Sequence, residues 1–317
     1  MSKVNINKSE HGAYLFVHFI HDKERKENQE QVYFSVSKDG VRWDTLNDKK
    51  PLLTSTLGDL GVRDPFIIRS PNENKFYIIG TDLSIYYRKD WEEVQKSGSQ
   101  HMVVWESEDL VNWSEQRLVK TGPKTAGCVW APEAIYDKET DDFLVFWASR
   151  ENFGAEKQKV YYSKTRDFIT FDEPKIYIER ENHIIDTTII EYKGKYYRFS
   201  KDETVKSITV EVSDRLLGEF TSIDTNLNDM IGVEGPACFK LQGEEKWCLL
   251  LDHYKNEKKY IPYYTNDLNT AKFIKSEEDM DIPVNSKHGG VMVITMDEYN
   301  ALINAYGIRH DIKSKKR

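Results

Sequence analysis

Five loose repeats constrain the fold of this chain more than any other feature. Each repeat is an apolar strand, a Ser or Thr, an Asp or a turn, and then an aromatic residue. The repeats are VYFSVSKDGVRW, MVVWESEDLVNW, KVYYSKTRDFITF, ITVEVSDRLLGEF and YIPYYTNDLNTAKF, ending at Trp43, Trp113, Phe171, Phe220 and Phe273. Each interval between them is long enough for four short strands. The pattern therefore predicts the blades of a β-propeller.

A second series of apolar strands, each opened by a polar corner, supports this prediction. The strands are RDPFII from Arg63, WAPEAIY from Trp130, IIDTTII from Ile184, VEGPACF from Val233 and KHGGVMVI from Lys287. A hairpin partner follows each of the first four, namely FYIIGTD, FLVFWAS, KYYRFSK and KWCLLLD. Strands that are apolar along their whole length are expected where both faces of a sheet are buried.

The fifth of these strands has no partner downstream, so its partner is predicted near the N-terminus, in AYLFVHFI from Ala13 followed by QVYFSVS. We therefore predict an all-β fold, a five-bladed β-propeller closed by N- and C-terminal strands that share one blade. Closure would remove an exposed sheet edge. Thr295 and Glu298 have capping-box spacing ahead of an apolar helical pattern, which predicts a short C-terminal helix. With no linker visible, residues 1–317 are expected to form a single propeller domain.

The composition of the chain indicates which kinds of molecule and which compartment the protein is suited to. The formal net charge of −8 disfavours nucleic-acid binding, because phosphate backbones need basic surfaces. No run of 18 apolar residues is present, so we expect no membrane span, and the N-terminus does not resemble a signal peptide. The three cysteines are few and odd in number, which fits a reducing compartment. We therefore expect a cytoplasmic protein; the pattern does not indicate an oligomeric state.

The polar corners become informative once a propeller is assumed, because the first strand of each blade then lines the central axis. Residues near the starts of these strands would meet in one funnel, and they are Asp64, Glu133, Asp186, Glu234 and His288. Asp-Pro and Glu-Gly-Pro are also ordinary turn sequences, so any single corner is better explained as a turn. The five together favour a functional site. Convergent carboxylates suit glycoside hydrolysis, which needs one protonated and one ionised carboxyl group.

At this point the chain resembles glycoside hydrolase family 43, whose five-bladed propellers include α-L-arabinofuranosidases, β-xylosidases and arabinanases. RDPFII resembles the strand of the family's general base, IIDTTII that of its pKa-modulating Asp, and VEGPACF that of its general acid. The resemblance thus implies that Asp64 is the base, Asp186 the modulator and Glu234 the acid. WAPEAIY resembles the family's Trp-Ala-Pro strand, so Trp130 would help to shape the pocket. Members differ at the position of Glu133, which is given no role.

The resemblance also bears on cofactors. His288 falls where many members place a His beside a central ion or water, so it is a candidate metal ligand, and a calcium or other ion in the central channel is a candidate cofactor. A hydrogen-bonded core histidine explains the residue equally well. No cofactor is required for the expected chemistry.

The mechanism that the resemblance implies is inversion. Asp64 would activate a water and Glu234 would protonate the leaving oxygen, with the two carboxyls about 6.5–9.5 Å apart. Three residues are weaker candidates for substrate binding. They are Thr188, two residues after Asp186, Arg198, and Trp130, whose ring could stack on a sugar. Packing explains each of them at least as well. The stretch from Thr81 to Trp91 would form a loop above the funnel, and such a bounded pocket would favour exo action.

The expected substrate is an oligosaccharide carrying a terminal pentose, with α-L-arabinofuranose first. A β-xylosidase or a galactofuranosidase of the same fold is the alternative. Rival classes are invertase-like propellers, which retain configuration, propeller phosphorylases, which need a basic phosphate pocket, and a non-catalytic sugar-binding propeller. The Trp-Met-Asn-Asp-Pro-Asn and Glu-Cys motifs of the invertase-like group are not found in the chain.

Overall fold

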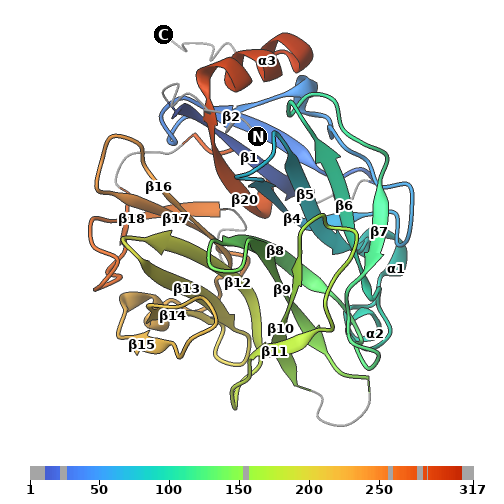
Figure 1. The fold of residues 1–317 in the computed structure, drawn as a ribbon, viewed down its shortest axis with the longest axis vertical. Coiled ribbons are helices and arrows are strands. Elements are labelled where there is room, and N and C mark those ends of the chain that lie inside the picture. The colour runs from blue at the N-terminus through green and yellow to red at the C-terminus, as the bar shows by residue number, and fades with distance from the viewer. Residues whose placement is uncertain are drawn as a thin grey trace.

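The computed structural model describes residues 11–21, 27–152, 157–255, 260–276, 281–283 and 285–308. Within them, five four-stranded antiparallel sheets surround a central axis (Figure 1). From the axis outward, blade 1 contains β4 (Val62–Arg69), β5 (Phe76–Asp82), β6 (His101–Ser107) and β7 (Arg117–Lys120). Blade 2 contains β8 (Trp130–Asp137), β9 (Asp142–Arg150), β10 (Gln158–Thr165) and β11 (Lys175–Ile178).

Blade 3 contains β12 (Ile184–Tyr192), β13 (Lys195–Asp202), β14 (Ser207–Ser213) and β15 (Thr221–Ile223). Blade 4 contains β16 (Glu234–Lys240), β17 (Trp247–Asp252), β18 (Tyr260–Thr265) and β19 (Ile274–Lys275). Blade 5 contains β20 (Ser286–Thr295), β1 (His11–Ile20), β2 (Tyr33–Ser37) and β3 (Asp44–Thr45). The five-bladed propeller predicted from the repeats is confirmed.

Helices are short and lie outside the blades. Two follow β5, namely α1 (Ile85–Arg88) and α2 (Trp91–Lys96), and 3₁₀ turns occur at η1 (Asn47–Lys49) and η2 (Asn226–Asp229). The predicted C-terminal helix is α3 (Met296–Tyr306), and Thr295 and Glu298 form the expected capping box. Among the described residues, no helix has the length and apolar character needed to cross a bilayer.

Blade 5 closes the ring in the predicted way. The C-terminal strand β20 pairs with β1 from Ile294 opposite Ala13 to Gly289 opposite His18, and β1 pairs in turn with β2 (Figure 1). Each innermost strand contacts the next one around the axis, including β20 against β4. The start and the end of the chain are therefore held in one sheet.

The sequence repeat corresponds to the turn between the third and fourth strands of a blade. In blade 5, Ser37 Oγ accepts from the N–H of Gly40 at 2.8 Å, and Asp39 Oδ1 accepts from the N–H of Val41 at 2.8 Å. The same Ser/Thr and Asp turns recur at Ser107 and Asp109, at Thr165 and Asp167, and at Thr265 and Asp267. Side chains that bond to nearby backbone favour turns over continued strand, which explains the repeat.

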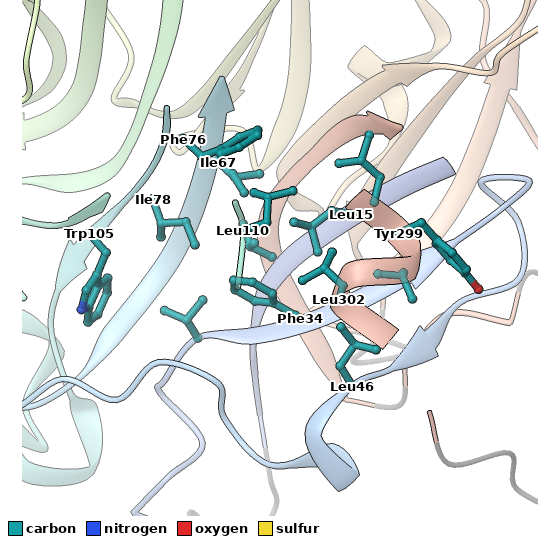
Figure 2. Packing of buried hydrophobic residues seen from close by; sticks show 14 of the residues in the cluster. Leu15, Phe34, Leu46, Ile67, Phe76, Ile78, Trp105, Leu110, Tyr299 and Leu302 are labelled. Atoms are coloured by element: carbon teal, nitrogen blue, oxygen red, sulfur yellow. The ribbon is translucent and has the colours of Figure 1, made fainter. Parts of the chain in front are cut away.

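The apolar core is divided among the spaces between blades. The largest cluster lies between blades 5 and 1 and is covered by α3 (Figure 2). Leu15 of β1 and Phe34 of β2 belong to it with Ile78 of β5, and Leu302 of α3 joins them. This cluster packs the closing blade against the first one.

All three cysteines are free thiols. Cys238 pairs in register with Leu249, and Cys248 pairs with Phe239. Because adjacent positions of a strand face opposite sides of the sheet, the two thiols of this hairpin point away from each other. They belong to different hydrophobic clusters.

Candidate active site

Every innermost strand has one extra residue near its start, relative to the strand it pairs with. In β4 the segment from Arg63 to Phe66 lies opposite the shorter segment from Thr81 to Ile79. Equivalent bulges occur in β8, β12, β16 and β20, between Trp130 and Glu133, Ile185 and Thr187, Glu234 and Ala237, and Ser286 and Gly289. Bulges bend a strand and re-aim its side chains, and they are frequent beside active sites.

Asp64 and Asp186 occupy the same position of their bulges. Both have left-handed backbone, with φ of 50° and 45°, as do Ala131 (46°) and Gly235 (57°) in the neighbouring blades. Non-glycine residues seldom adopt this conformation, and Asp is among those that tolerate it. Glu234 lies one residue before this position and Glu133 two residues after it. The corners that looked alike in the sequence are therefore not equivalent.

The starts of the innermost strands surround a cavity of ≈ 470 Å³. Of the predicted site residues, Asp64, Trp130, Asp186, Glu234 and His288 line it together. The structure thus brings three carboxylates from β4, β12 and β16 into one pocket.

Asp64 is held by neighbours from blades 1 and 5. Thr81 Oγ1 of β5 donates to its Oδ2 at 3.1 Å, and the same hydroxyl accepts from the N–H of Ala131 at 2.8 Å. His288 Nδ1 lies 3.3 Å from Asp64 Oδ1. Burial favours the neutral carboxyl, but His288, Arg63 and Thr81 outweigh it and hold the pKa of Asp64 below its usual value. Asp64 is therefore ionised at neutral pH, as a general base must be.

Asp186 has a different environment. Burial raises its pKa to about 6, although the charges of His288 and Lys201 oppose this shift. Its Oδ2 accepts from the N–H of Gly235 at 3.1 Å, and Gly235 directly follows Glu234. Gly235 is required here, because a Cβ on it would lie 2.8 Å from His288 Cβ. Asp186 thereby fixes the backbone that carries Glu234.

Glu234 is more accessible to solvent than Asp64. Its side chain is 30% exposed, against 16% for Asp64. Lys201 Nζ of β13 donates to Glu234 Oε2 at 2.7 Å. The accessible carboxyl is the one suited to exchange its proton with a leaving group and then with water.

His288 lies between two carboxylates, Asp64 and Glu133. Its Nδ1 lies against Asp64, and its Nε2 lies 3.8 Å from Glu133 Oε1. Burial disfavours the charged ring, but Asp64, Glu133 and Asp186 outweigh burial and raise the pKa of His288 well above its usual value. No group of three or more His, Cys, Asp or Glu suited to a metal occurs among the described residues, so the ion at His288 stays a prediction.

Glu133, to which the sequence assigned no role, thus balances the charge of His288. Burial raises the pKa of Glu133, and the carboxyl is bonded by His288 and Thr188. Thr188 is buried beside Glu133 and is not part of the described cavity lining. The bulge at Asp186 breaks the simple strand alternation from which Thr188 was predicted to contact substrate.

Arg198 lies away from the cavity. Its Nε donates to Glu211 Oε2 at 2.8 Å, and its guanidinium lies 3.8 Å from the centre of the Phe220 ring. Arg198 pairs with Ile189, four residues beyond Ile185, where the strand has already left the funnel. The structure places Arg198 in packing within blade 3 rather than against a substrate.

Lys201 is the residue of β13 that reaches the cavity, and the sequence analysis above missed it. Counting the hairpin register from the tight turn at Lys193 and Gly194 predicts Lys201 opposite Asp186, and the bulge moves it to Ile185, still next to Asp186. That count was the available signal. Two further ion pairs in the lining were also missed, Arg63 with Glu30 at 2.8 Å and Lys287 with Asp252 at 2.8 Å.

The connection between β5 and β6 forms a wall of the cavity. Leu83, Ile85, Trp91 and Gln95 of this connection line it. The Trp91 ring stands nearly perpendicular to that of Trp130, with centroids 6.2 Å apart, and the Arg63 guanidinium lies 5.0 Å from the Trp91 centroid. Trp91 is 46% exposed, so it presents aromatic surface at the rim. The predicted loop above the funnel is thus this helical connection.

A five-bladed propeller with three carboxylates in unlike environments around its axial cavity defines a carboxylate-dependent glycosidase. The family model described as a probable glycosyl hydrolase domain, related to family 43, matches residues 9–300. The chain belongs to glycoside hydrolase family 43, as its motifs predicted.

Individual relatives agree with this assignment. An α-L-arabinofuranosidase of Bifidobacterium longum subsp. longum is 30% identical over 241 residues, which cover 64% of this chain and 22% of that protein. The structure titled endo-1,4-β-xylanase from Bacteroides thetaiotaomicron aligns with a TM-score of 0.60 at 13% identity, over 88% of this chain and 93% of that one. An α-L-arabinanase of Cellvibrio cellulosa, solved with arabinohexaose, gives 0.57 at 14% identity, over 86% and 94%. Both structures show the shared fold.

The raised pKa of Asp186 predicts a stability cost. The folded state keeps this proton up to about pH 6, whereas the unfolded chain releases it near 3.8, so the free energy of unfolding falls as pH rises between these values. We expect Asp186→Asn, which avoids the buried charge, to be more stable than the wild type by about 1–3 kcal/mol at pH 7.5. The difference should shrink towards zero at pH 4.

Urea denaturation at both pH values measures this difference. Asp229→Asn, at an exposed carboxylate, serves as the matched control and should change little at either pH. An Asp186→Asn protein that is less stable than the wild type at pH 7.5, or whose advantage is the same at pH 4, would contradict the assignment.

Proposed function

We propose that this protein is an inverting, exo-acting glycoside hydrolase that releases terminal α-L-arabinofuranose from short oligosaccharides. The observation that carries the proposal is the contrast between Asp64 and Glu234. Asp64 is kept ionised by His288 and Arg63, whereas Glu234 is the more accessible carboxyl and comes from a different blade. A base and an acid on separate blades, facing one cavity, fit a single displacement.

In this mechanism Asp64 takes a proton from water as the water oxygen attacks the anomeric carbon. The bond from that carbon to the leaving oxygen breaks, and Glu234 gives its proton to that oxygen. Asp64 is then protonated and Glu234 ionised, and exchange with water restores both. Asp186 orients Glu234 through the N–H of Gly235, and its raised pKa reflects burial first, with smaller contributions from the nearby Asp64 and Glu234 carboxylates.

Exo action is supported by the shape of the pocket. The connection between β5 and β6 forms a wall of the cavity next to Trp130. Glu30, from the segment between β1 and β2, holds this wall in place. Glu30 accepts from Ser84 Oγ at 2.9 Å and from the N–H of Tyr86 at 3.0 Å. A bounded pocket suits a terminal residue better than the interior of a chain.

Substrate choice rests on the relatives. The matched segment of the Bifidobacterium protein belongs to an α-L-arabinofuranosidase, which favours arabinofuranose, and the chain spans about a fifth of that protein's length. β-Xylosidase and galactofuranosidase activities remain the alternatives within the same site. A phosphorylase is disfavoured, because every Lys and Arg in the described lining is already bound to a carboxylate. The three catalytic candidates disfavour a purely sugar-binding protein.

A panel of aryl glycosides, with the released sugar followed by NMR, tests the proposal. We expect the fastest turnover with the α-L-arabinofuranoside and a product of inverted anomeric configuration. A retained anomer would contradict the mechanism. Turnover that needs phosphate would indicate a phosphorylase, and binding without turnover would indicate a sugar-binding protein.

The two carboxylates should respond differently to the leaving group. Asp64→Asn should lower kcat by a factor of about 10²–10⁴ on every substrate, because no group then activates water. Glu234→Gln should lower it by a similar factor on oligosaccharides but by much less on aryl glycosides, whose leaving groups need little protonation. Equal losses with Glu234→Gln on both kinds of substrate would contradict its role as the acid.

The exposed ring at the rim should bind the sugar beyond the cleaved bond. We expect Trp91→Ala to raise KM for oligosaccharides about 5- to 150-fold, taking the loss of a stacked ring as about 1–3 kcal/mol, as for bases stacked on aromatic side chains. Tyr87→Ala is the matched control, because Tyr87 is a similarly exposed aromatic of the same connection, 41% exposed, outside the cavity lining. Equal KM changes in both variants would contradict a specific contact.

A further inference from the structure

Lys201 is a buried cation placed among acidic groups. Its side chain is 3% exposed. The ammonium donates to Glu234 Oε2 at 2.7 Å and lies 2.6 Å from Glu203 Oε2. Asp186 adds a third carboxylate from the neighbouring strand and contributes to raising the pKa of Lys201, against the effect of burial. One ammonium thus faces three carboxylates.

This contact has a consequence for the proton of the acid. A general acid must carry a proton, whereas an ammonium that donates to a carboxyl favours its ionised form. A proton on Glu234 Oε2 would point at the ammonium of Lys201 and be repelled. The proton must therefore sit on Oε1, the oxygen that Lys201 does not bind.

Glu203 explains how Glu234 can hold a proton at all beside this cation. Its carboxylate takes part of the ammonium's charge, and Lys206 Nζ also donates to Glu203 Oε1. With Lys206 counted, the three carboxylates Glu234, Glu203 and Asp186 and the two ammonium groups carry a net charge of −1 when all are ionised, so the ammonium of Lys201 is shared and does not belong to Glu234 alone.

We propose that Lys201 is a positioning residue for the acid: shared between Glu234 and Glu203, it selects the oxygen of Glu234 that carries the proton and sets the pH range in which the acid is protonated. This inference rests on the proposed role of Glu234. It assigns Glu203 as the partner that moderates the charge of Lys201. No step of it requires Lys201 to touch the substrate.

Other charged groups face Glu234, and they are held in separate pairs. Asp252 of β17 is bound by Lys287 of β20, and Arg63 of β4 is bound by Glu30. Tyr254, after β17, lies against Lys201, with its ring centre 4.8 Å from Nζ. Because substitutions at Lys201 and Glu203 leave the Asp252 and Arg63 pairs in place, shifts in the pH profile report the shared ammonium.

The test measures kcat/KM against pH for Lys201→Met, Lys201→Arg and Glu203→Gln, with an oligosaccharide and with an aryl glycoside of a good leaving group. Lys201→Met should move the alkaline limb up by about 1 pH unit, since the ionised acid loses its cation. Glu203→Gln should move it down, because Lys201 then bonds Glu234 alone. Lys201→Arg should stay within about 0.3 unit of the wild type, because a cation is retained.

Lys201→Met should also lower kcat about 10- to 100-fold on the oligosaccharide and less on the aryl glycoside, as expected when the acid's proton is misplaced. The matched control is Lys159→Met, which removes another buried lysine, bound to Glu179 at 2.9 Å and outside the cavity lining. Its alkaline limb should not move.

The outcomes separate this inference from the proposed function. Opposite shifts with Lys201→Met and Glu203→Gln would support the inference. An active wild type whose alkaline limb is unchanged in both variants, or moves in the same direction in both, would overturn it while leaving the proposed function intact. A wild type that hydrolyses none of the glycosides would instead overturn the proposed function.

Discussion

Closure of the ring through β20 and β1 is the constraint on which the rest of the structure depends. This pairing joins the two ends of the chain in one sheet and brings β20 against β4. Only in a closed ring do the starts of the innermost strands face a common axis. Asp64 and Glu234, which are distant in the sequence, share one cavity for this reason. The core between blades 5 and 1, with α3 over it, holds the closure in place.

The bulges turn this closed ring into a site. An extra residue in each innermost strand puts Asp64 and Asp186 in left-handed backbone and places Glu234 one step earlier. Such conformations are unfavourable outside glycine, so the surrounding sheet must hold them. The same distortion brings the Gly235 backbone against His288 and lets Asp186 bond to it. Local strain and catalytic geometry therefore have one cause.

Crowded carboxylates would repel one another, and the site resolves this by pairing. Arg63 binds Glu30, Lys287 binds Asp252, and His288 lies between Asp64 and Glu133. Burial and pairing together separate the carboxyls by proton affinity: His288 and Arg63 keep Asp64 ionised, whereas burial raises the pKa of Asp186 to about 6. Acid and base chemistry in one pocket requires that separation.

The sequence by itself determined the strands, the turns, the closing blade and the three carboxylates, because these depend on local patterns: alternation, side-chain bonds to nearby backbone, and Asp-Pro or Glu-Gly-Pro corners. The sequence pattern predicted Arg198 as the substrate contact from β13, whereas Lys201 is the residue that reaches the cavity, and it gave Glu133 no role. Only the tertiary structure decided which cation meets which carboxylate and which connection walls the pocket. The physical reason is that one bulge residue shifts every later position of a strand, and that contacts across the axis join blades remote in sequence.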